Sequence, residues 1–159
     1  RLVETTVQVN DARKIGMAGR IIAACNGDIT GKTIAVLGLT FKPETDDMRE
    51  SPSIPILHRL SEAGATLRVF DPVGHDTARP MLPPETIYCA DALDAATGAD
   101  ALVVLTEWNI FRAMSPTAIK KVMAGKIVVD LRNIFDPQAM KEAGMTYQSI
   151  GRPEKIRHT

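Results

Sequence analysis

The sequence has no excess of charge of either sign: 19 Lys and Arg residues balance 19 Asp and Glu residues. A protein that holds nucleic acid needs a basic field, so this balance argues against a nucleic-acid partner. Long apolar runs are also absent, because stretches such as Ala101–Leu105 are far shorter than the roughly 20 residues that cross a bilayer. With no signal peptide at its start, we expect a cytoplasmic protein with no membrane partner.

Cysteine and histidine are scarce. Cys25 and Cys89 have no CxxC spacing, and a pair so far apart in an intracellular type of sequence favours two reduced thiols over a disulfide. We interpret both as packing residues. Because His58, His75 and His158 show no ligand spacing with each other or with the cysteines, we assign no metal site.

Hydrophobic residues make up 45% of the 159 residues, which is enough to bury the core of one domain, whereas two full domains would be cramped. Apolar residues recur at helical spacing through residues 1–28, and Gly27 supplies the expected stop. Ile22 and Cys25 lie on the main apolar stripe of this helix, and Ile21 lies off it. Apolar residues on two sides predict a helix that packs against more than one surface, such as another subunit.

The rest of the chain alternates short apolar runs with helical patterns. An apolar run from Thr33 to Leu37 predicts a buried strand, and Ser51 as N-cap with Pro52 at the first position predicts a helix that ends at Gly64. Further strands are predicted over residues 66–70, 86–89, 101–105, 126–129 and 145–148, and helices over residues 91–97, 116–123 and 137–143.

This alternation predicts an α/β, Rossmann-like three-layer sandwich: a mostly parallel sheet with helices on both faces, preceded by the long helix. We expect residues 29–151 to form this domain and residues 152–159 to form a flexible tail. In such a sheet, ligands bind beyond the carboxyl ends of the strands.

The glycine-rich fingerprint of a dinucleotide site is missing, because no GxGxxG follows the first strand at Gly38. Phosphate charge would then be met largely by side chains. Lys42, beyond the first strand, and Arg132, beyond the 126–129 strand, are the two cations so placed. By position alone, both are more readily interpreted as solvated loop residues.

Three other residues allow two interpretations. Arg49 follows an acidic run, and the simple interpretation is a surface charge cluster with Asp46, Asp47 or Glu50. Asp71 ends the second strand, where a Rossmann domain often places a ribose-binding acid, but an Asp-Pro pair favours a turn. Trp108 could line a cleft, although packing is favoured.

Residues 38–43 read GLTFKP and residues 45–53 read TDDMRESPS. Together they closely resemble the signature that opens the C-terminal, UDP-binding domain of the UDP-glucose/GDP-mannose dehydrogenase family, above all of its bacterial members that oxidise UDP-glucose. Further landmarks of that family are matched in the same order by VFDP at 69–72, TEW at 106–108 and VDLRN at 129–133. The pair Asn10-Asp11 resembles one on the family's long central helix.

The resemblance implies a two-step oxidation of UDP-glucose to UDP-glucuronate that reduces two NAD⁺. In such enzymes an N-terminal Rossmann domain holds NAD and carries the catalytic cysteine, and the central helix, here residues 1–28, mediates homodimer formation. By position, Phe41, Lys42 and Arg132 would contact the nucleotide-sugar, and Arg49 would reach the NAD on the other domain. No residue here matches the family's nucleophile loop, so the chain alone is expected to be inactive.

Two alternatives stay open. The same domain could belong to a UDP-N-acetylsugar or GDP-mannose dehydrogenase of this family. The chain could also be a non-enzymatic α/β module that binds partners through its first helix.

Overall fold

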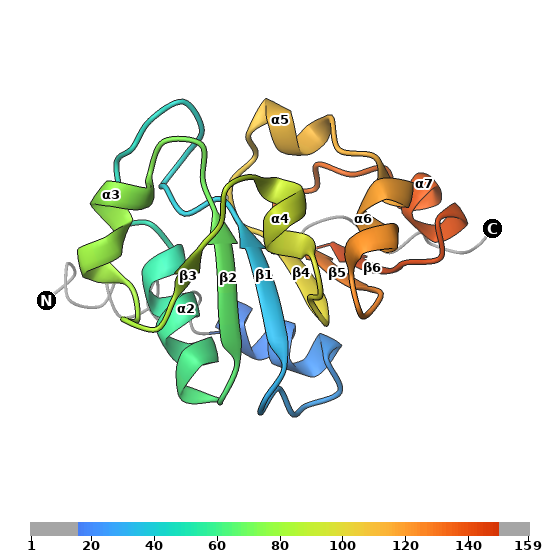
Figure 1. The fold of residues 1–159 in the computed structure, drawn as a ribbon, viewed down its shortest axis with the longest axis horizontal. Helices are drawn as coiled ribbons and strands as arrows, with labels where there is room; N and C mark the ends of the chain where they lie inside the picture. The colour runs from blue at the N-terminus through green and yellow to red at the C-terminus, as the bar shows by residue number, and fades with distance from the viewer. Residues whose placement is uncertain (1–15, 150–159) are drawn as a thin grey trace, which may run out of the picture.

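The computed structural model describes residues 16–149, which form a six-stranded sheet with the spatial order β3-β2-β1-β4-β5-β6 (Figure 1). The strands are β1 (Thr33–Leu37), β2 (Thr66–Phe70), β3 (Ile87–Tyr88), β4 (Ala101–Val104), β5 (Ile127–Asp130) and β6 (Thr146–Ser149). Every neighbouring pair is parallel. The predicted α/β Rossmann-like class is therefore confirmed, with a sheet that is parallel throughout.

Helices connect the strands. They are a first helix, described over residues 16–24, and α2 (Ser53–Glu62), α3 (His75–Ala78), α4 (Ala92–Ala96), α5 (Asn109–Arg112), α6 (Pro116–Val122) and α7 (Pro137–Glu142), with a 3₁₀ turn η1 (Arg79–Met81). None of the helices in the described part of the chain is both long and apolar enough to span a bilayer.

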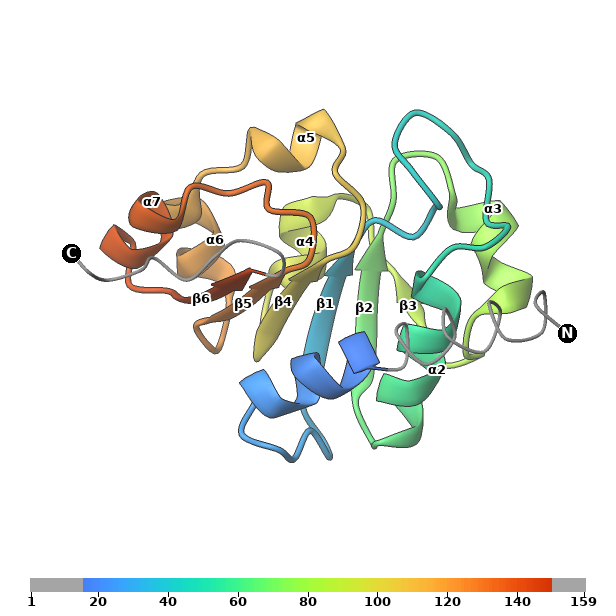
Figure 2. The ribbon, with the colours of Figure 1, turned by 180° about the vertical axis from the view of Figure 1, so that it is seen from behind.

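The helices cover both faces of the sheet, as the two opposite views show (Figures 1 and 2). The first helix and α2 pack on one face, and α4, α6 and α7 pack on the other. Successive side chains of β1 point to opposite faces of the sheet and so pack in two cores. Ile34 and Val36 belong to the first core, and Ala35 and Leu37 belong to the second. The three-layer prediction is thus confirmed by two separate apolar clusters.

The first helix buries part of the predicted stripe and one residue off it. Ala18 and Cys25 are buried as predicted, Ile21 is buried although it was predicted off the stripe, and Ile22 is only half-buried. Apolar residues on neighbouring faces offered two helical stripes, and contact with the sheet selects the one through Ile21. The predicted helix over residues 1–15 and the predicted tail at 152–159 lie outside the described residues.

The elements that the sequence did not predict are short. Helices α3 and α5 have one turn each, and η1 has three residues. Helix α2 starts at Ser53 with Pro52 as N-cap, one residue later than predicted. The hydroxyl of Ser51 still serves this helix start, because it accepts a hydrogen bond from Ser53 N–H at 3.2 Å.

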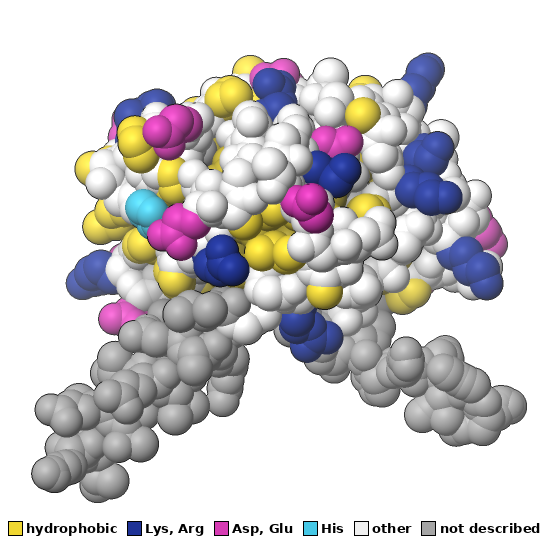
Figure 3. Space-filling model, turned by 90° about the horizontal axis from the view of Figure 1, so that it is seen from below, with side chains coloured by type: hydrophobic (Ala, Val, Ile, Leu, Met, Phe, Trp, Pro, Cys, Tyr) yellow, Lys and Arg dark blue, Asp and Glu magenta, His cyan; other side chains and the backbone are white. Residues whose placement is uncertain are grey.

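Charges of both signs lie among one another on the face of the molecule seen from below. Seen from below, Lys and Arg side chains alternate with Asp and Glu side chains, and apolar groups lie between them (Figure 3). This mixture of charges among the described residues (Figure 3) agrees with the equal numbers of acidic and basic residues in the sequence.

Candidate functional site

The candidate site lies at the carboxyl edge of the sheet, where the loops after β1, β4 and β5 emerge together. Strand order reverses between β1 and β4, because the chain runs outward through β2 and β3 before it returns to β4. In open parallel sheets this switch point is where ligands bind. The β1 loop and α5 stand above this edge in Figure 1.

A buried carboxylate, Asp71 at the end of β2, organises the β1 loop. It accepts hydrogen bonds from Leu39 N–H at 2.7 Å and Thr40 N–H at 3.2 Å, and from Val73 and Gly74 N–H at 3.1 and 2.8 Å. Asp71 is 2% exposed. The turn interpretation of Asp71 is thus confirmed, and its oxygens already serve the backbone of two loops.

The start of α2 is closed by the protein itself. The Leu39 carbonyl accepts hydrogen bonds from the hydroxyls of Ser51 at 2.6 Å and Ser53 at 2.7 Å. A dinucleotide domain presents the corresponding helix start to a pyrophosphate. This helix start is thus engaged within the protein, and the expectation that side chains meet phosphate charge stays a prediction.

Phe41 and Lys42 project from a loop that is tied at its base. Phe41 N–H donates to the Asp47 carbonyl at 2.9 Å, and the Thr40 hydroxyl donates to the Lys42 carbonyl at 3.0 Å. Both side chains are exposed, and the Phe41 ring is one of the few large apolar groups at the surface, at 47% exposure. The loop therefore offers a ring and a cation to solvent.

Arg49 forms a forked pair with Asp47. Its Nε and Nη2 donate to the two Asp47 carboxylate oxygens, each at 3.0 Å. These hydrogen bonds, with one from Arg49 N–H, lower the pKa of Asp47 to about 2. The surface charge cluster suggested by sequence is thus present, with Asp47 as the partner. The same loop borders a shallow hollow of about 450 Å³, across which Thr77 donates to the Asp46 carbonyl.

A second buried carboxylate, Asp130 at the end of β5, organises the loop that carries Arg132. It accepts from Arg132, Ile134 and Phe135 N–H at 3.1, 2.9 and 3.0 Å, and from the Tyr147 hydroxyl at 2.7 Å. Asp130 is fully buried. It therefore fixes the backbone from which the Arg132 side chain leaves.

The Arg132 side chain is held by Glu107, which follows β4. Arg132 Nε donates to Glu107 Oε1 at 2.8 Å, and Nη2 donates to Oε2 at 3.1 Å. Burial acts to raise the pKa of Glu107, but the hydrogen bonds and charge of Arg132 prevail and the pKa lies below its usual value. The pair is half-exposed, so Arg132 is neither a free surface cation nor a buried one.

Sequence reasoning did not find Glu107 as a site residue. Its signal was its position two residues beyond an apolar run, as Arg132 lies two residues beyond β5. Only the pairing of β4 with β5 shows that the two ends are neighbours, with Val104 opposite Asp130. Trp108, the next residue, is 6% exposed and packs in the core, as favoured.

His75 makes a hydrogen bond within the neighbouring loop, which follows β2. Asp71 N–H donates to His75 Nε2 at 3.0 Å, so this nitrogen carries no proton. The His75 ring packs edge-on against Phe70 and Tyr88, with centroids 5.6 and 5.3 Å away, and Arg79 stacks on Tyr88 at 4.2 Å. Burial lowers the pKa of His75.

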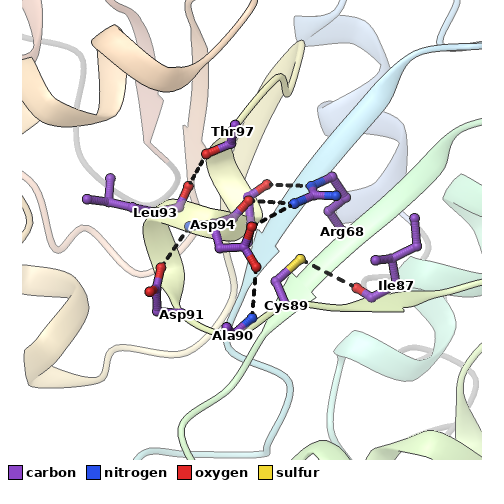
Figure 4. A network of polar contacts seen from close by, with 9 residues as sticks. Arg68, Ile87, Cys89, Ala90, Asp91, Leu93, Asp94 and Thr97 are labelled. Carbon is purple, nitrogen blue, oxygen red and sulfur yellow. Dashed lines mark hydrogen bonds and ion pairs between the residues drawn. The ribbon is translucent and has the colours of Figure 1, made fainter.

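The cysteines pack, as predicted. Both are buried and free, and burial raises the pKa of each thiol. Cys89 lies beside a polar network in which Arg68 of β2 pairs with Asp94 of α4 at 3.1 Å (Figure 4). Within residues 16–149, no group of three His, Cys, Asp or Glu side chains is arranged to hold a metal ion.

Comparison with known proteins gives consistent matches. Residues 35–137 match the family model described as UDP-glucose/GDP-mannose dehydrogenase family, UDP binding domain. A UDP-glucose 6-dehydrogenase of Rhizobium meliloti (strain 1021) is 52% identical over 155 residues, which are 97% of this chain and 35% of that protein. A UDP-glucose 6-dehydrogenase of Bacillus subtilis (strain 168) is 32% identical over 153 residues, 96% of this chain and 33% of that protein.

Solved structures agree with the fold. A UDP-glucose dehydrogenase of Pyrobaculum islandicum matches with a TM-score of 0.70 and 28% identity, over 86% of this chain and 29% of that one. A UDP-D-ManNAc dehydrogenase of Pyrococcus horikoshii matches with a TM-score of 0.68 and 27% identity, over 89% and 31%. The chain thus spans about a third of the length of the relatives that it matches.

Proposed function

Because the chain belongs to the UDP-glucose/GDP-mannose dehydrogenase family and contains its UDP-binding domain, we propose that it binds the nucleotide-sugar substrate of a UDP-glucose 6-dehydrogenase. The longer enzyme would oxidise UDP-glucose to UDP-glucuronate and reduce two NAD⁺. In this scheme an N-terminal domain holds NAD and supplies the catalytic groups, and the present chain does not catalyse alone.

One observation carries the proposal: a ring and two cations reach the same sheet edge from strands on either side of β4. Phe41 and Lys42 follow β1, and Arg132 follows β5. Lys42 would supply a point charge and Arg132 a two-pronged donor for the diphosphate, because phosphate oxygens accept both. The exposed Phe41 ring would contact the nucleotide-sugar through its face. Because the Leu39 carbonyl engages Ser51 and Ser53 at the start of α2, we assign the diphosphate to the side chains of Lys42 and Arg132.

Arg49 has a separate role in the proposal. Its side chain is 86% exposed, and the fork to Asp47 uses only Nε and Nη2. Within the described part of the chain, the opposite edge of the guanidinium keeps free N–H donors, which would bind a phosphate of NAD held by the other domain.

The first helix would mediate a homodimer, since its described part already buries one stripe against the sheet and residues 1–15 continue the apolar pattern. We place the enzyme in the cytoplasm and its product in polysaccharide biosynthesis. Sedimentation of the enzyme and of its Val7→Asp variant tests the dimer, which the buried charge should disperse.

Calorimetric titration of the chain and of the longer enzyme with UDP, UDP-glucose, GDP and ADP tests nucleotide binding. We expect UDP ligands to bind, and the paired change Lys42→Ala with Arg132→Ala to weaken them at least tenfold. Arg59→Ala, an exposed cation in the last turn of α2, is the matched control and should leave binding unchanged. Preference for ADP, or UDP binding that survives the paired change, would contradict the proposal.

Substrate choice within the family needs its own test, because one solved structure similar to this chain is a UDP-D-ManNAc dehydrogenase. The 52% identity to a UDP-glucose 6-dehydrogenase favours UDP-glucose. Activity of the longer enzyme on UDP-glucose, UDP-N-acetylsugars and GDP-mannose, compared as kcat/KM, decides between them.

A further inference from the structure

We infer that Glu107 is a positioning residue for the nucleotide-sugar: it holds the Arg132 guanidinium so that the outer N–H edge faces the phosphates. The inference rests on the function proposed above and adds Glu107 to the residues assigned to the site. Glu107 itself would not touch the ligand.

The hydrogen bonds define which edge of Arg132 is available. Glu107 takes Nε and one proton of Nη2, at 2.8 and 3.1 Å. A guanidinium has five N–H donors in a fixed plane, so Nη1 and the second proton of Nη2 form a further forked edge. Arg132 makes no other side-chain hydrogen bond within residues 16–149. That second edge has the spacing that a phosphate takes with two parallel bonds.

Backbone hydrogen bonds fix the segments that carry Arg132 and Glu107. Leu131 N–H donates to the Val104 carbonyl at 3.1 Å, and Asp130 accepts from Arg132 N–H, so the β5 loop is tied to the sheet. On the other side, Leu105 N–H donates to the Leu37 carbonyl at 2.9 Å, two residues before Glu107. The ion pair therefore sets the direction of the Arg132 side chain from two strand ends that do not move independently.

The pair is placed for orientation more than for stability. The Arg132 and Glu107 side chains are 40% and 27% exposed, and half-exposed ion pairs contribute little to folding. An arginine that is free in solvent loses several rotamers when it binds, which reduces affinity by about tenfold. Glu107 fixes the Arg132 side chain in one orientation before the ligand binds, so that this loss of rotamers does not reduce affinity.

Charge repulsion and orientation predict opposite changes in UDP affinity when Glu107 is replaced. Glu107 keeps its negative charge next to a diphosphate site, and repulsion alone predicts that removing the charge tightens binding. Through solvent and physiological salt that repulsion amounts to only about two- to threefold. Orientation is the larger effect, so loss of Glu107 should weaken UDP binding.

UDP is titrated calorimetrically against the enzyme that contains this chain and against its Glu107→Gln, Arg132→Ala and doubly changed variants. We expect Glu107→Gln to weaken UDP about tenfold, Arg132→Ala to weaken it further, and the double variant to bind no worse than Arg132→Ala alone. Because Glu107 acts through Arg132, the KM for UDP-glucose should rise in Glu107→Gln with kcat nearly unchanged.

The matched control is Asp94→Asn, which breaks a similar half-exposed pair with Arg68 away from the site. It should lower the Tm by a similar amount and leave UDP affinity unchanged. If Glu107→Gln binds UDP as well as or better than wild type while Arg132→Ala binds weakly, the positioning role is wrong and the proposed function stands. Equal weakening by Asp94→Asn would also overturn the positioning role. If Arg132→Ala has no effect or wild type does not bind UDP, the proposed function itself fails.

Discussion

Gly38 and Thr106 lie so close that a Cβ atom on Gly38 would stand 2.5 Å from Thr106 Cβ and 2.6 Å from its backbone nitrogen. The contact joins the ends of β1 and β4, across the switch point of the sheet. The Thr106 hydroxyl adds a second link between the two strand ends, because it donates a hydrogen bond to the Thr40 carbonyl at 2.9 Å. The loops that leave β1 and β4 are therefore held together at their base, next to the candidate site.

Gly38→Ala should destabilise the domain by about 2 kcal/mol or more, because it adds a clash with backbone atoms to a backbone conformation at φ +95° that side chains rarely adopt. Urea unfolding followed by circular dichroism measures the loss. Gly98→Ala is the control, since Gly98 has φ +75° but open space around it. It should cost only about 1 kcal/mol of backbone strain. Equal losses in the two variants would show that the contact with Thr106 is unimportant.

Asp71→Asn should weaken both the fold and UDP binding. The carboxylate accepts from Leu39 and Thr40 N–H, immediately before Phe41 and Lys42, and an amide NH₂ group in its place would face those donors. We expect a loss of about 2–3 kcal/mol in the free energy of unfolding. UDP affinity, measured under conditions where the variant is folded, should fall with it.

Asp76→Asn provides the comparison for that variant, because Asp76 is an exposed acid in the first turn of α3. It should leave UDP affinity unchanged. If Asp71→Asn binds UDP as wild type does, the β1 loop does not depend on this carboxylate for its binding conformation.

His75 should make the domain less stable in mild acid. Burial lowers its pKa below the ordinary 6.5, and Arg79 adds to this while Asp71 and Asp76 oppose it. As pH falls through about 6.5, His75 becomes protonated in the unfolded chain but stays neutral in the folded chain. The free energy of unfolding therefore falls. The stabilisation is complete above the unfolded pKa and is lost as pH falls toward the folded value. Protonation of Nε2 would also remove the acceptor for Asp71 N–H.

Thermal unfolding between pH 7.5 and 5 measures this effect. His75→Gln cannot titrate, so its Tm should fall less over this range than that of wild type. His58→Gln, a change at an exposed histidine of α2, should keep the wild-type slope. Parallel curves for wild type and His75→Gln would mean that His75 does not contribute to the acid sensitivity.

The sequence predicted the sheet far better than the contacts of the site. Apolar runs such as Ala101–Leu105 identify strands by composition alone, because strands buried on both faces have few polar residues. Position placed Lys42 and Arg132 just beyond the ends of two strands, as the structure has them, and their contact with the nucleotide-sugar stays a prediction. The pairing of Glu107 with Arg132 depends on which strands are neighbours, and local sequence does not contain that information. The one-turn helices α3 and α5 escaped prediction because four residues show no periodicity.

Asp47 should titrate at about pH 2, because the fork from Arg49 and the Arg49 N–H stabilise its carboxylate. Carboxyl ¹³C NMR of the chain during an acid titration measures this pKa directly. In Arg49→Ala the value should rise toward the ordinary 3.8, since the side-chain hydrogen bonds are the largest cause of the shift. Arg59→Ala should leave it unchanged. A wild-type midpoint near 3.8 would mean that the Arg49 side chain is not held in solution, and the proposed NAD contact would then require Arg49 to become ordered only on binding.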